Sequence, residues 1–189
     1  MSRYESRILK IVAAGAALAT AYFALASEAQ GQEYDGFRHG AEVAIGASYS
    51  EHGEGDDFDF ASGALRYHFD WNERWGVEGS FARQKHDFAH SDYYELSARF
   101  TFFANDRIRL FALAGGGLLR YDYDYPIIDG SRFEGTEEAS AYHAGIAAQV
   151  ALGERFYFRP DLRQRWVTDF FESSDDSSSE ATLGFGYRF

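Results

Sequence analysis

The sequence predicts an all-β fold, an eight-stranded antiparallel up-and-down transmembrane β-barrel, and three observations support this prediction. From Gly40 onward, apolar and polar residues alternate with a period of two. The connections between the alternating segments are short and long in turn, as in bacterial membrane barrels. Lysine, which soluble β proteins place on exposed edges, occurs only twice against sixteen arginines, so the sheet is not expected to face water in the usual way.

Composition excludes several other classes of protein. The chain has 189 residues, enough for one domain, and it has no cysteine for a disulfide, a thiolate metal site or a nucleophile. Its net charge of -12 argues against a nucleic-acid partner, because binding phosphates needs clustered Lys and Arg. A mean hydropathy of -0.40 without a long central apolar run excludes a helical membrane bundle.

The first 29 residues have the pattern of an export signal peptide. Three basic residues among the first ten precede an uncharged stretch at 11–26, and small residues place the cleavage after Ala29 or Ala26. A membrane anchor is the alternative, but sixteen residues rich in Ala and Gly are short for a span of about 30 Å. Residues 30–38 are then expected to form a short periplasmic segment, and 39–189 the barrel.

The first four alternating segments each set an apolar face against a polar or small face, as expected for strands exposed on two different sides. Val43, Ile45, Ala47 and Tyr49 alternate with Glu42, Gly46 and Ser48; Leu65, Tyr67 and Phe69 with Ala64, Arg66 and His68; Trp75, Val77 and Phe81 with Gly76, Glu78 and Ser80; and Tyr94, Leu96, Ala98, Phe100 and Phe102 with Tyr93, Glu95, Ser97, Arg99 and Thr101.

The last four segments continue this pattern, although Leu110 and Leu118 fall on the face assigned as polar. Phe111, Leu113, Leu119, Tyr121 and Tyr123 alternate with Ala112, Ala114, Gly116 and Arg120; Tyr142, Ala144, Ile146, Ala148, Val150 and Leu152 with His143, Gly145 and Gln149; Phe156, Phe158, Pro160, Leu162, Trp166 and Phe170 with Arg155, Arg159, Asp161, Arg163, Arg165 and Asp169; and Ala181, Leu183, Phe185, Tyr187 and Phe189 with Glu180, Thr182, Gly184, Gly186 and Arg188.

Alternation alone leaves open which face points inward, since a soluble barrel would fill its lumen with the apolar residues. The polar face is rich in Gly, Ala, Ser and Arg–Glu partners and has no lysine, and the apolar face is aromatic near the strand ends, as membrane interfaces require. We therefore expect the apolar face to contact lipid. The short connections are 70–74, 104–106 and 153–154, and the long ones lie near 51–57, 84–92, 122–138 and 172–179.

Three segments resemble pieces of a known family: Gly184-Phe185-Gly186-Tyr187-Arg188-Phe189 at the carboxy terminus, Trp75-Gly76-Val77-Glu78-Gly79-Ser80, and Arg159-Pro160-Asp161-Leu162-Arg163. With the export signal and the strand count, the chain resembles the small eight-stranded outer-membrane β-barrels, such as the transmembrane domain of outer membrane protein A and its single-domain relatives. The resemblance covers nearly all of the mature chain.

This resemblance implies a place in the outer membrane of a Gram-negative bacterium, with both termini in the periplasm. The partners it implies are outer-membrane lipids, lipopolysaccharide and, during biogenesis, the barrel-assembly machinery. That machinery would recognise an assembly signal in the last strand, formed by Leu183, Phe185, Tyr187 and Phe189.

The polar face is expected to place a network of charges in the lumen. Eight strands leave an interior only wide enough for side chains, and buried arginines and carboxylates must pair there because unpaired buried charges are costly. This network would plug the barrel; a gated ion path or a catalytic cluster is the alternative. The network comprises Glu42, Arg66, Glu78, Glu95, Arg99, Arg159, Asp161, Arg163, Arg165 and Arg188, with Asp70, Arg120 and Glu180 on the same face.

The six histidines do not form a recognisable metal or cofactor site, and we expect no cofactor. His86 and His90 have the i, i+4 spacing of a helical zinc motif, but they fall in a loop and lack its general-base Glu. His68 and His143 lie on the lumen face and are expected to be partners of Glu or Arg rather than bases.

Some eight-stranded barrels are lipid A-modifying enzymes, which makes catalysis the next hypothesis. The outer-membrane deacylase family uses a His and a Ser two residues apart on a late strand, whereas here His143 is followed by Ala144 and Gly145. The palmitoyltransferase family needs a His with an Asp-Ser pair in its outer loops, and His90 is followed by Ser and Asp in the wrong order. The sequence therefore predicts no enzyme.

The predicted function is a non-enzymatic, structural or surface-interaction role in the cell envelope. A small pore or transporter is the alternative, with a lipid A-modifying enzyme behind it. The acidic outer loops are expected to form a solvated rim. The alternatives are that they bind the phosphates of lipopolysaccharide through bridging divalent cations, or that they adhere to a basic host or matrix surface. The longest loop could dock an extracellular partner or cover the barrel mouth through Tyr123, Tyr125, Ile127, Ile128 and Phe133.

Overall fold

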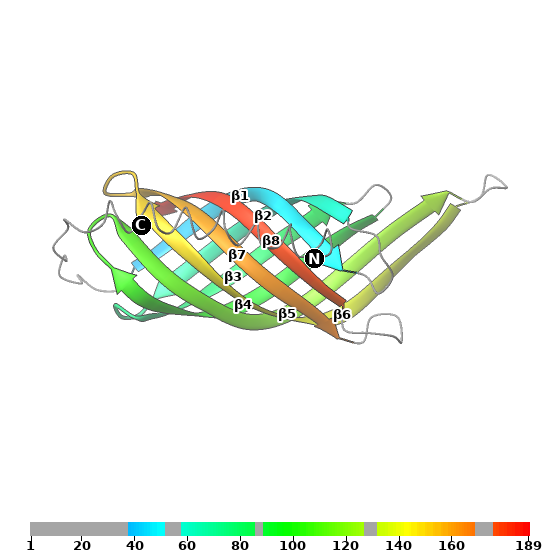
Figure 1. Cartoon of the computed structure of the whole chain (residues 1–189), viewed down its shortest axis with the longest axis horizontal. Helices are drawn as coiled ribbons and strands as arrows, with labels where there is room; N and C mark the ends of the chain where they lie inside the picture. Colours follow the sequence, from blue (N-terminus) through cyan, green and yellow to red (C-terminus); the bar gives the residue numbers. More distant parts are fainter. Residues whose placement is uncertain (1–37, 52–57, 86–88, 127–131, 169–175) are drawn as a thin grey trace, which may run out of the picture.

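Eight antiparallel strands follow one another around a closed barrel in the computed structural model, which describes residues 38–51, 58–85, 89–126, 132–168 and 176–189. Each strand pairs with its neighbours in the chain, and the first pairs with the last (Figure 1). The predicted fold class is confirmed. The strands are β1 (Arg38–Glu51), β2 (Phe58–Asp70), β3 (Trp75–Lys85), β4 (Ala89–Ala104), β5 (Ile108–Pro126), β6 (Arg132–Ala151), β7 (Phe156–Thr168) and β8 (Asp176–Arg188).

The predicted export signal, and nearly all of the periplasmic segment after it, lie outside the described residues. Within the described part of the chain, no helix is long and apolar enough to span a membrane.

Three tight turns close one end of the barrel, and asparagine side chains build two of them. Asn72 Oδ1 accepts hydrogen bonds from the backbone N–H groups of Arg74 and Trp75, both at 2.8 Å. Asn105 Oδ1 does the same for the N–H groups of residues 107 and 108, at 2.9 and 2.8 Å. The third turn contains Gly153 with a φ of 147°, a conformation that L side chains rarely adopt. Short-range chemistry thus fixes these turns.

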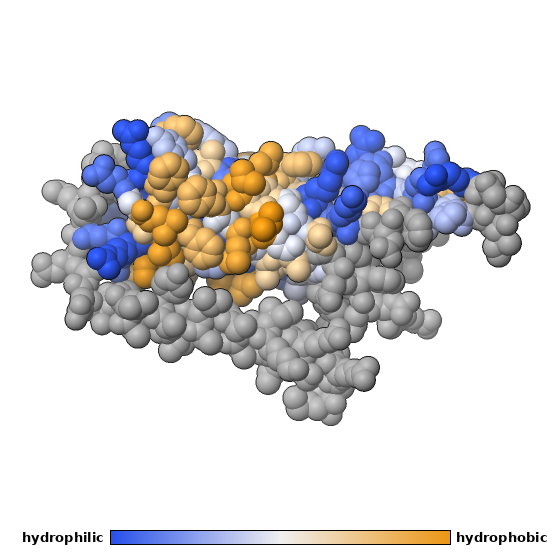
Figure 2. All heavy atoms as spheres, turned by 90° about the horizontal axis from the view of Figure 1, so that it is seen from above, coloured by the Kyte–Doolittle hydropathy of each residue, from blue (hydrophilic) through white to orange (hydrophobic). Residues whose placement is uncertain are grey.

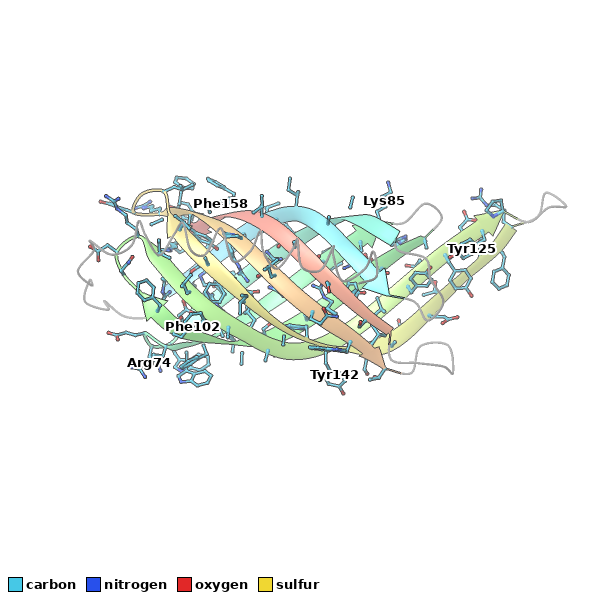
Figure 3. All side chains as sticks on the ribbon, viewed as in Figure 1. Arg74, Lys85, Phe102, Tyr125, Tyr142 and Phe158 are labelled. Carbon is cyan, nitrogen blue, oxygen red and sulfur yellow. The ribbon has the colours of Figure 1, made fainter. Side chains whose placement is uncertain are left out.

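The outer surface of the barrel is apolar and its interior is polar, which is the reverse of a soluble barrel. Outward side chains such as Ile45 and Leu96 are 71% and 63% exposed, whereas Glu78 and Gln149 on the polar face are fully buried. Tyr142 points away from the barrel wall (Figure 3). Apolar residues gather in a band, with hydrophilic residues toward both ends (Figure 2). This arrangement suits a barrel surrounded by lipid.

The prediction for the faces of β5 is wrong. Phe111, Leu113 and Leu119 were assigned to the lipid face, but they are buried inside the barrel, and Leu118 is 59% exposed on the outside. Inside the lumen, Phe111 packs against two arginines in cation–π contacts. The guanidinium carbons of Arg99 and Arg159 lie 4.3 and 4.9 Å from the centre of the Phe111 ring. A register shift between residues 101 and 103 of β4 precedes this strand.

Because the two faces of β5 are the reverse of the prediction, two arginines of this strand also lie on the opposite side from the one predicted. Arg120 was placed in the lumen by the sequence pattern, but its side chain is 51% exposed and pairs with Asp122 at 3.1 Å. Arg109, which the pattern did not select, is buried in the lumen instead.

The longest predicted loop is mostly strand. β5 and β6 have 19 and 20 residues, while the other strands have 11 to 16, and their pairing continues to Pro126 and Arg132. The pairing of β6 with β7 ends at Ser140 and Thr168. The β5–β6 hairpin therefore projects beyond the other strands (Figure 1), and Tyr125 lies on this projection (Figure 3). Residues 127–131 of this predicted loop, and residues 52–57, 86–88 and 169–175 in or beside the other predicted loops, fall outside the described residues.

Two glycines let β5 approach β4 closely. A Cβ on Gly115 would lie 2.0 Å from the carbonyl oxygen of Leu96, and one on Gly117 would lie 1.8 Å from that of Tyr94. A Cβ on Gly79, on the outer face of β3, would meet no atom within 4 Å. Backbone cannot move aside as a flexible side chain can, so a side chain is excluded at the first two positions.

Gly115→Ala and Gly117→Ala should each lower the free energy of unfolding by about 1–3 kcal/mol, the usual cost of overpacking. Gly79→Ala is the matched control and should leave it within about 0.5 kcal/mol. Urea unfolding of the protein refolded in detergent micelles measures the difference. Equal stability of all three variants would contradict the close approach of β4 and β5.

Candidate functional site

The candidate site is the charged lumen, which strand alternation builds from the inward faces of the barrel. Among the described residues, six arginines and six carboxylates are buried there, so their formal charges balance. They are Arg66, Arg99, Arg109, Arg159, Arg163 and Arg165, with Glu42, Asp70, Glu78, Glu95, Asp161 and Glu180.

Glu78 on β3 is the centre of the network. Its two carboxylate oxygens accept hydrogen bonds from Arg159 and Arg163 of β7, each at 2.5 Å. Asp161, between these arginines on the inner face of β7, accepts from Arg159 at 2.5 Å and from Arg163 at 2.9 Å. Glu42 of β1 lies 3.6 Å from Arg159 and pairs with Arg66 of β2 at 2.6 Å. The pairs thus cross the lumen from β7 to β3 and β1.

A second cluster forms around Glu95 of β4, nearer the end of the barrel opposite the three tight turns. Arg165 donates to both of its oxygens, at 2.6 and 3.0 Å, and pairs with Glu180 of β8 at 2.8 Å. Arg163 lies 3.4 Å from Glu95 and so joins this cluster to the one around Glu78. The guanidinium of Arg165 also lies 4.6 Å from the centre of the Tyr93 ring. Such charge-assisted contacts are short and directional, and they fix the arginine side chains.

A third cluster closes the end with the tight turns. Arg109 donates to Asp70 at 2.8 Å, Arg99 lies 3.5 Å from the same carboxylate, and Arg99 also donates to Gln149 at 3.4 Å. Of the ten residues predicted for the network, nine are buried in the lumen. The tenth, Arg188, is half-buried with its guanidinium 5.4 Å from the centre of the Tyr157 ring.

Sequence spacing did not bring together Ser97, His143 and Glu95, which meet in the structure. His143 reaches past Gly115, the residue paired with both it and Ser97, so that its Nε2 lies 2.8 Å from Ser97 Oγ. Its Nδ1 lies 3.2 Å from Glu95 Oε1. This is the order of groups in a hydrolytic triad, but Ser97 and His143 are only 1% and 2% exposed. The contact between Ser97 and His143 follows from the pairing registers of β4, β5 and β6, which the local sequence does not contain.

In the described part of the chain, no three His, Asp or Glu side chains are grouped so that they could hold a metal ion. His86 lies outside the described residues, and His90 lies 3.3 Å from Asp122.

The outer part of the β5–β6 hairpin is the second candidate surface. On its charged face, Asp122 accepts hydrogen bonds from Thr136 and Arg120, and Arg132 pairs with Asp124. The hydrogen bond from Thr136, with the added effect of Arg120, lowers the pKa of Asp122 below its usual range. Asp122 is thus held in its ionised form, and Asp122 and Asp124 each have a neighbouring partner on this face.

Replacing Glu78 by Gln should leave two buried guanidinium groups without their central anion. We expect Glu78→Gln to lower the free energy of unfolding by about 3 kcal/mol, because breaking a buried ion pair exposes its desolvation cost. Glu154→Gln, in the exposed turn between β6 and β7, should change it by less than about 0.5 kcal/mol. Urea titration followed by gel mobility without boiling measures both, and equal midpoints would contradict a stabilising network.

Comparisons with known proteins agree with this geometry. The family model described as outer membrane protein beta-barrel domain matches residues 12–189. The crystal structure of Neisserial surface protein A aligns with a TM-score of 0.67 and 14% identity, over 84% of this chain and 100% of that one. Ail, the attachment invasion locus protein of Yersinia pestis, aligns with a TM-score of 0.58 and 22% identity, over 82% and 100%.

At these identities the two structures show a shared fold alone, and a search of curated protein sequences finds no match. The family model covers the whole barrel, and the barrel carries its apolar residues outside and its charges inside. The chain therefore belongs to the outer-membrane β-barrel family that its sequence resembles.

Proposed function

We propose that the protein is a closed, non-enzymatic barrel that stabilises the outer membrane and presents a contact surface outside the cell. The observation that carries this proposal is the filled lumen. Arg99, Arg159 and Arg165 are among the largest side chains in it, and each is less than 2% exposed. An ion path past them would have to break several of the buried pairs, which the surrounding low-polarity wall makes costly.

The proposed orientation places both chain ends in the periplasm and the β5–β6 hairpin outside. Its support is that Arg38 and Phe189 lie at the same end as the three short turns. In bacterial barrels the short turns face the periplasm and the longer connections face outward.

A hydrolase is the second candidate, because Ser97, His143 and Glu95 have the order and contacts of a catalytic triad. Two features argue for a structural role instead. The serine is buried inside the charged lumen, and Glu95 is already bound by Arg165 through both oxygens. A nucleophile must reach its substrate, and lipid A lies outside the barrel wall.

Purified protein in planar bilayers should give no current steps above leak, and lipid A incubated with it should keep its mass. Ser97→Ala should change neither result. Current steps that change size in Glu78→Gln would identify a pore through the charged lumen. A change in lipid A mass that Ser97→Ala abolishes would identify a hydrolase.

We propose that the last strand also carries the assembly signal. β8 must pair with β1 to close the barrel, and outward Phe185 pairs with Val43. Phe189 donates its backbone N–H to the carbonyl of His39 at 3.0 Å, and its ring lies 5.3 Å from that of Tyr187. An unclosed edge in lipid would leave unpaired backbone groups, each costing several kcal/mol.

Deletion of Phe189, or replacement of Tyr187 and Phe189 by Asp, should block insertion while export and signal cleavage continue. The product should then accumulate in the periplasm or be degraded there. Asp106→Asn, in an exposed turn, is the control and should insert normally. Membrane fractionation with unboiled gel mobility measures this. Normal amounts of heat-modifiable truncated protein in the outer membrane would refute the assignment.

A further inference from the structure

The outer ribbon, defined as residues 120–126 of β5 and 132–138 of β6, extends beyond the barrel, and past Tyr123 it is two-stranded. Its two strands pair with each other up to Pro126 and Arg132. The pairing of β4 with β5 ends at Tyr123, and that of β6 with β7 ends at Ser140. A two-stranded ribbon cannot bury both of its faces by itself. One face of the outer ribbon is therefore available to another molecule.

The face of the outer ribbon that continues the lumen side is aromatic. The ring of Tyr123 lies 5.4 Å from Phe133 and stacks on it, and it lies 5.9 and 6.0 Å from Tyr121 and Tyr125. A Cβ on Gly135 would lie 2.2 Å from the Tyr123 hydroxyl, so this glycine is what lets the tyrosine lie across β6. Phe133 and Tyr125 remain 57% and 42% exposed. These rings form a continuous platform rather than scattered exposed residues.

The charge of the outer ribbon selects the kind of partner. It carries five acids and two arginines. Both arginines face other acids of the ribbon: Arg120 pairs with Asp122, and Arg132 with Asp124. Glu137, which pairs across the ribbon with Tyr121, alternates onto the aromatic side, and neither of the ribbon's two arginines is paired with it. A carboxylate beside partly exposed aromatic rings favours a cationic partner.

Other occupants are disfavoured by the same charges. The whole chain has a net charge of -12, so a second copy or a polyanion would meet like charge at this end. A guanidinium or ammonium group, in contrast, gains both from the ring faces and from the carboxylate. We propose that the aromatic face of the outer ribbon docks an Arg/Lys-rich segment of another protein, with Tyr125 and Phe133 stacking on its cations and Glu137 pairing with one of them. This inference rests on the proposed surface-contact function.

A fluorescein-labelled hexa-arginine peptide is the probe, and fluorescence anisotropy with the full-length barrel in zwitterionic micelles is the measurement. We expect saturable binding that the double variant Tyr125→Ala/Phe133→Ala weakens at least tenfold and Glu137→Gln weakens about threefold. Trp71→Ala is the aromatic control, since Trp71 is also 42% exposed but lies in a turn at the opposite end. Glu154→Gln, in another turn of that end, is the charge control. Both controls should bind like the unmodified protein.

Several outcomes would overturn the proposal. Equal weakening in the controls would show attraction by net charge alone, and preferred binding of a hexa-glutamate peptide would reverse the sign of the partner. Sedimentation of the unliganded protein as a dimer that Tyr125→Ala/Phe133→Ala dissolves would assign the face to a second copy. Unboiled gel mobility verifies that each variant is folded, because the outer ribbon lies beyond the closed part of the barrel. Peptide binding is measured apart from conductance and lipid A mass, so either proposal can fail alone.

Discussion

Closure of the sheet is the constraint on which the rest of this molecule depends. In hydrocarbon, an unpaired N–H or C=O has no water to bond with, so β1 must find β8 and leave no edge. Closure with eight strands also sets the width of the lumen, which is only large enough for side chains. Alternation then assigns every second side chain to that interior, and the sequence has to fill it with groups that fit and pair.

The interior is filled by ions rather than by hydrocarbon, because the apolar residues are needed on the outside. Balanced arginines and carboxylates meet this demand, with Glu78, Glu95 and Asp70 each receiving at least two arginines. Aromatic rings also contribute to the packing, since the Phe111 ring lies against the guanidinium groups of Arg99 and Arg159. The lumen is thus the core of this protein, and its cohesion is electrostatic and directional.

The period of two was enough to predict the eight strands and, for seven of them, the face in contact with lipid. The face assignment failed in β5, where Ala112 and Ala114 face outward and the Phe111 ring lies against arginines inside. A pattern that assigns the more apolar residues to the lipid gives the wrong face where the lumen contains an aromatic ring. The acidic composition of 122–138 hid a ribbon that alternates Asp with Tyr. The meeting of Ser97 with His143 depends on the registers of three strands, which no local pattern contains.

The order of the strands around the barrel has a consequence for how the chain folds. Seven of the eight pairings join strands adjacent in the chain, three of them across tight turns that asparagine or glycine already shapes. Only β1 with β8 joins the two ends of the sequence, so this pairing has the largest loop-closure entropy cost, and we expect it to form last. Until β1 pairs with β8, the sheet has two edge strands with unpaired backbone groups that can pair with another chain. A longer time in this state therefore favours aggregation over insertion.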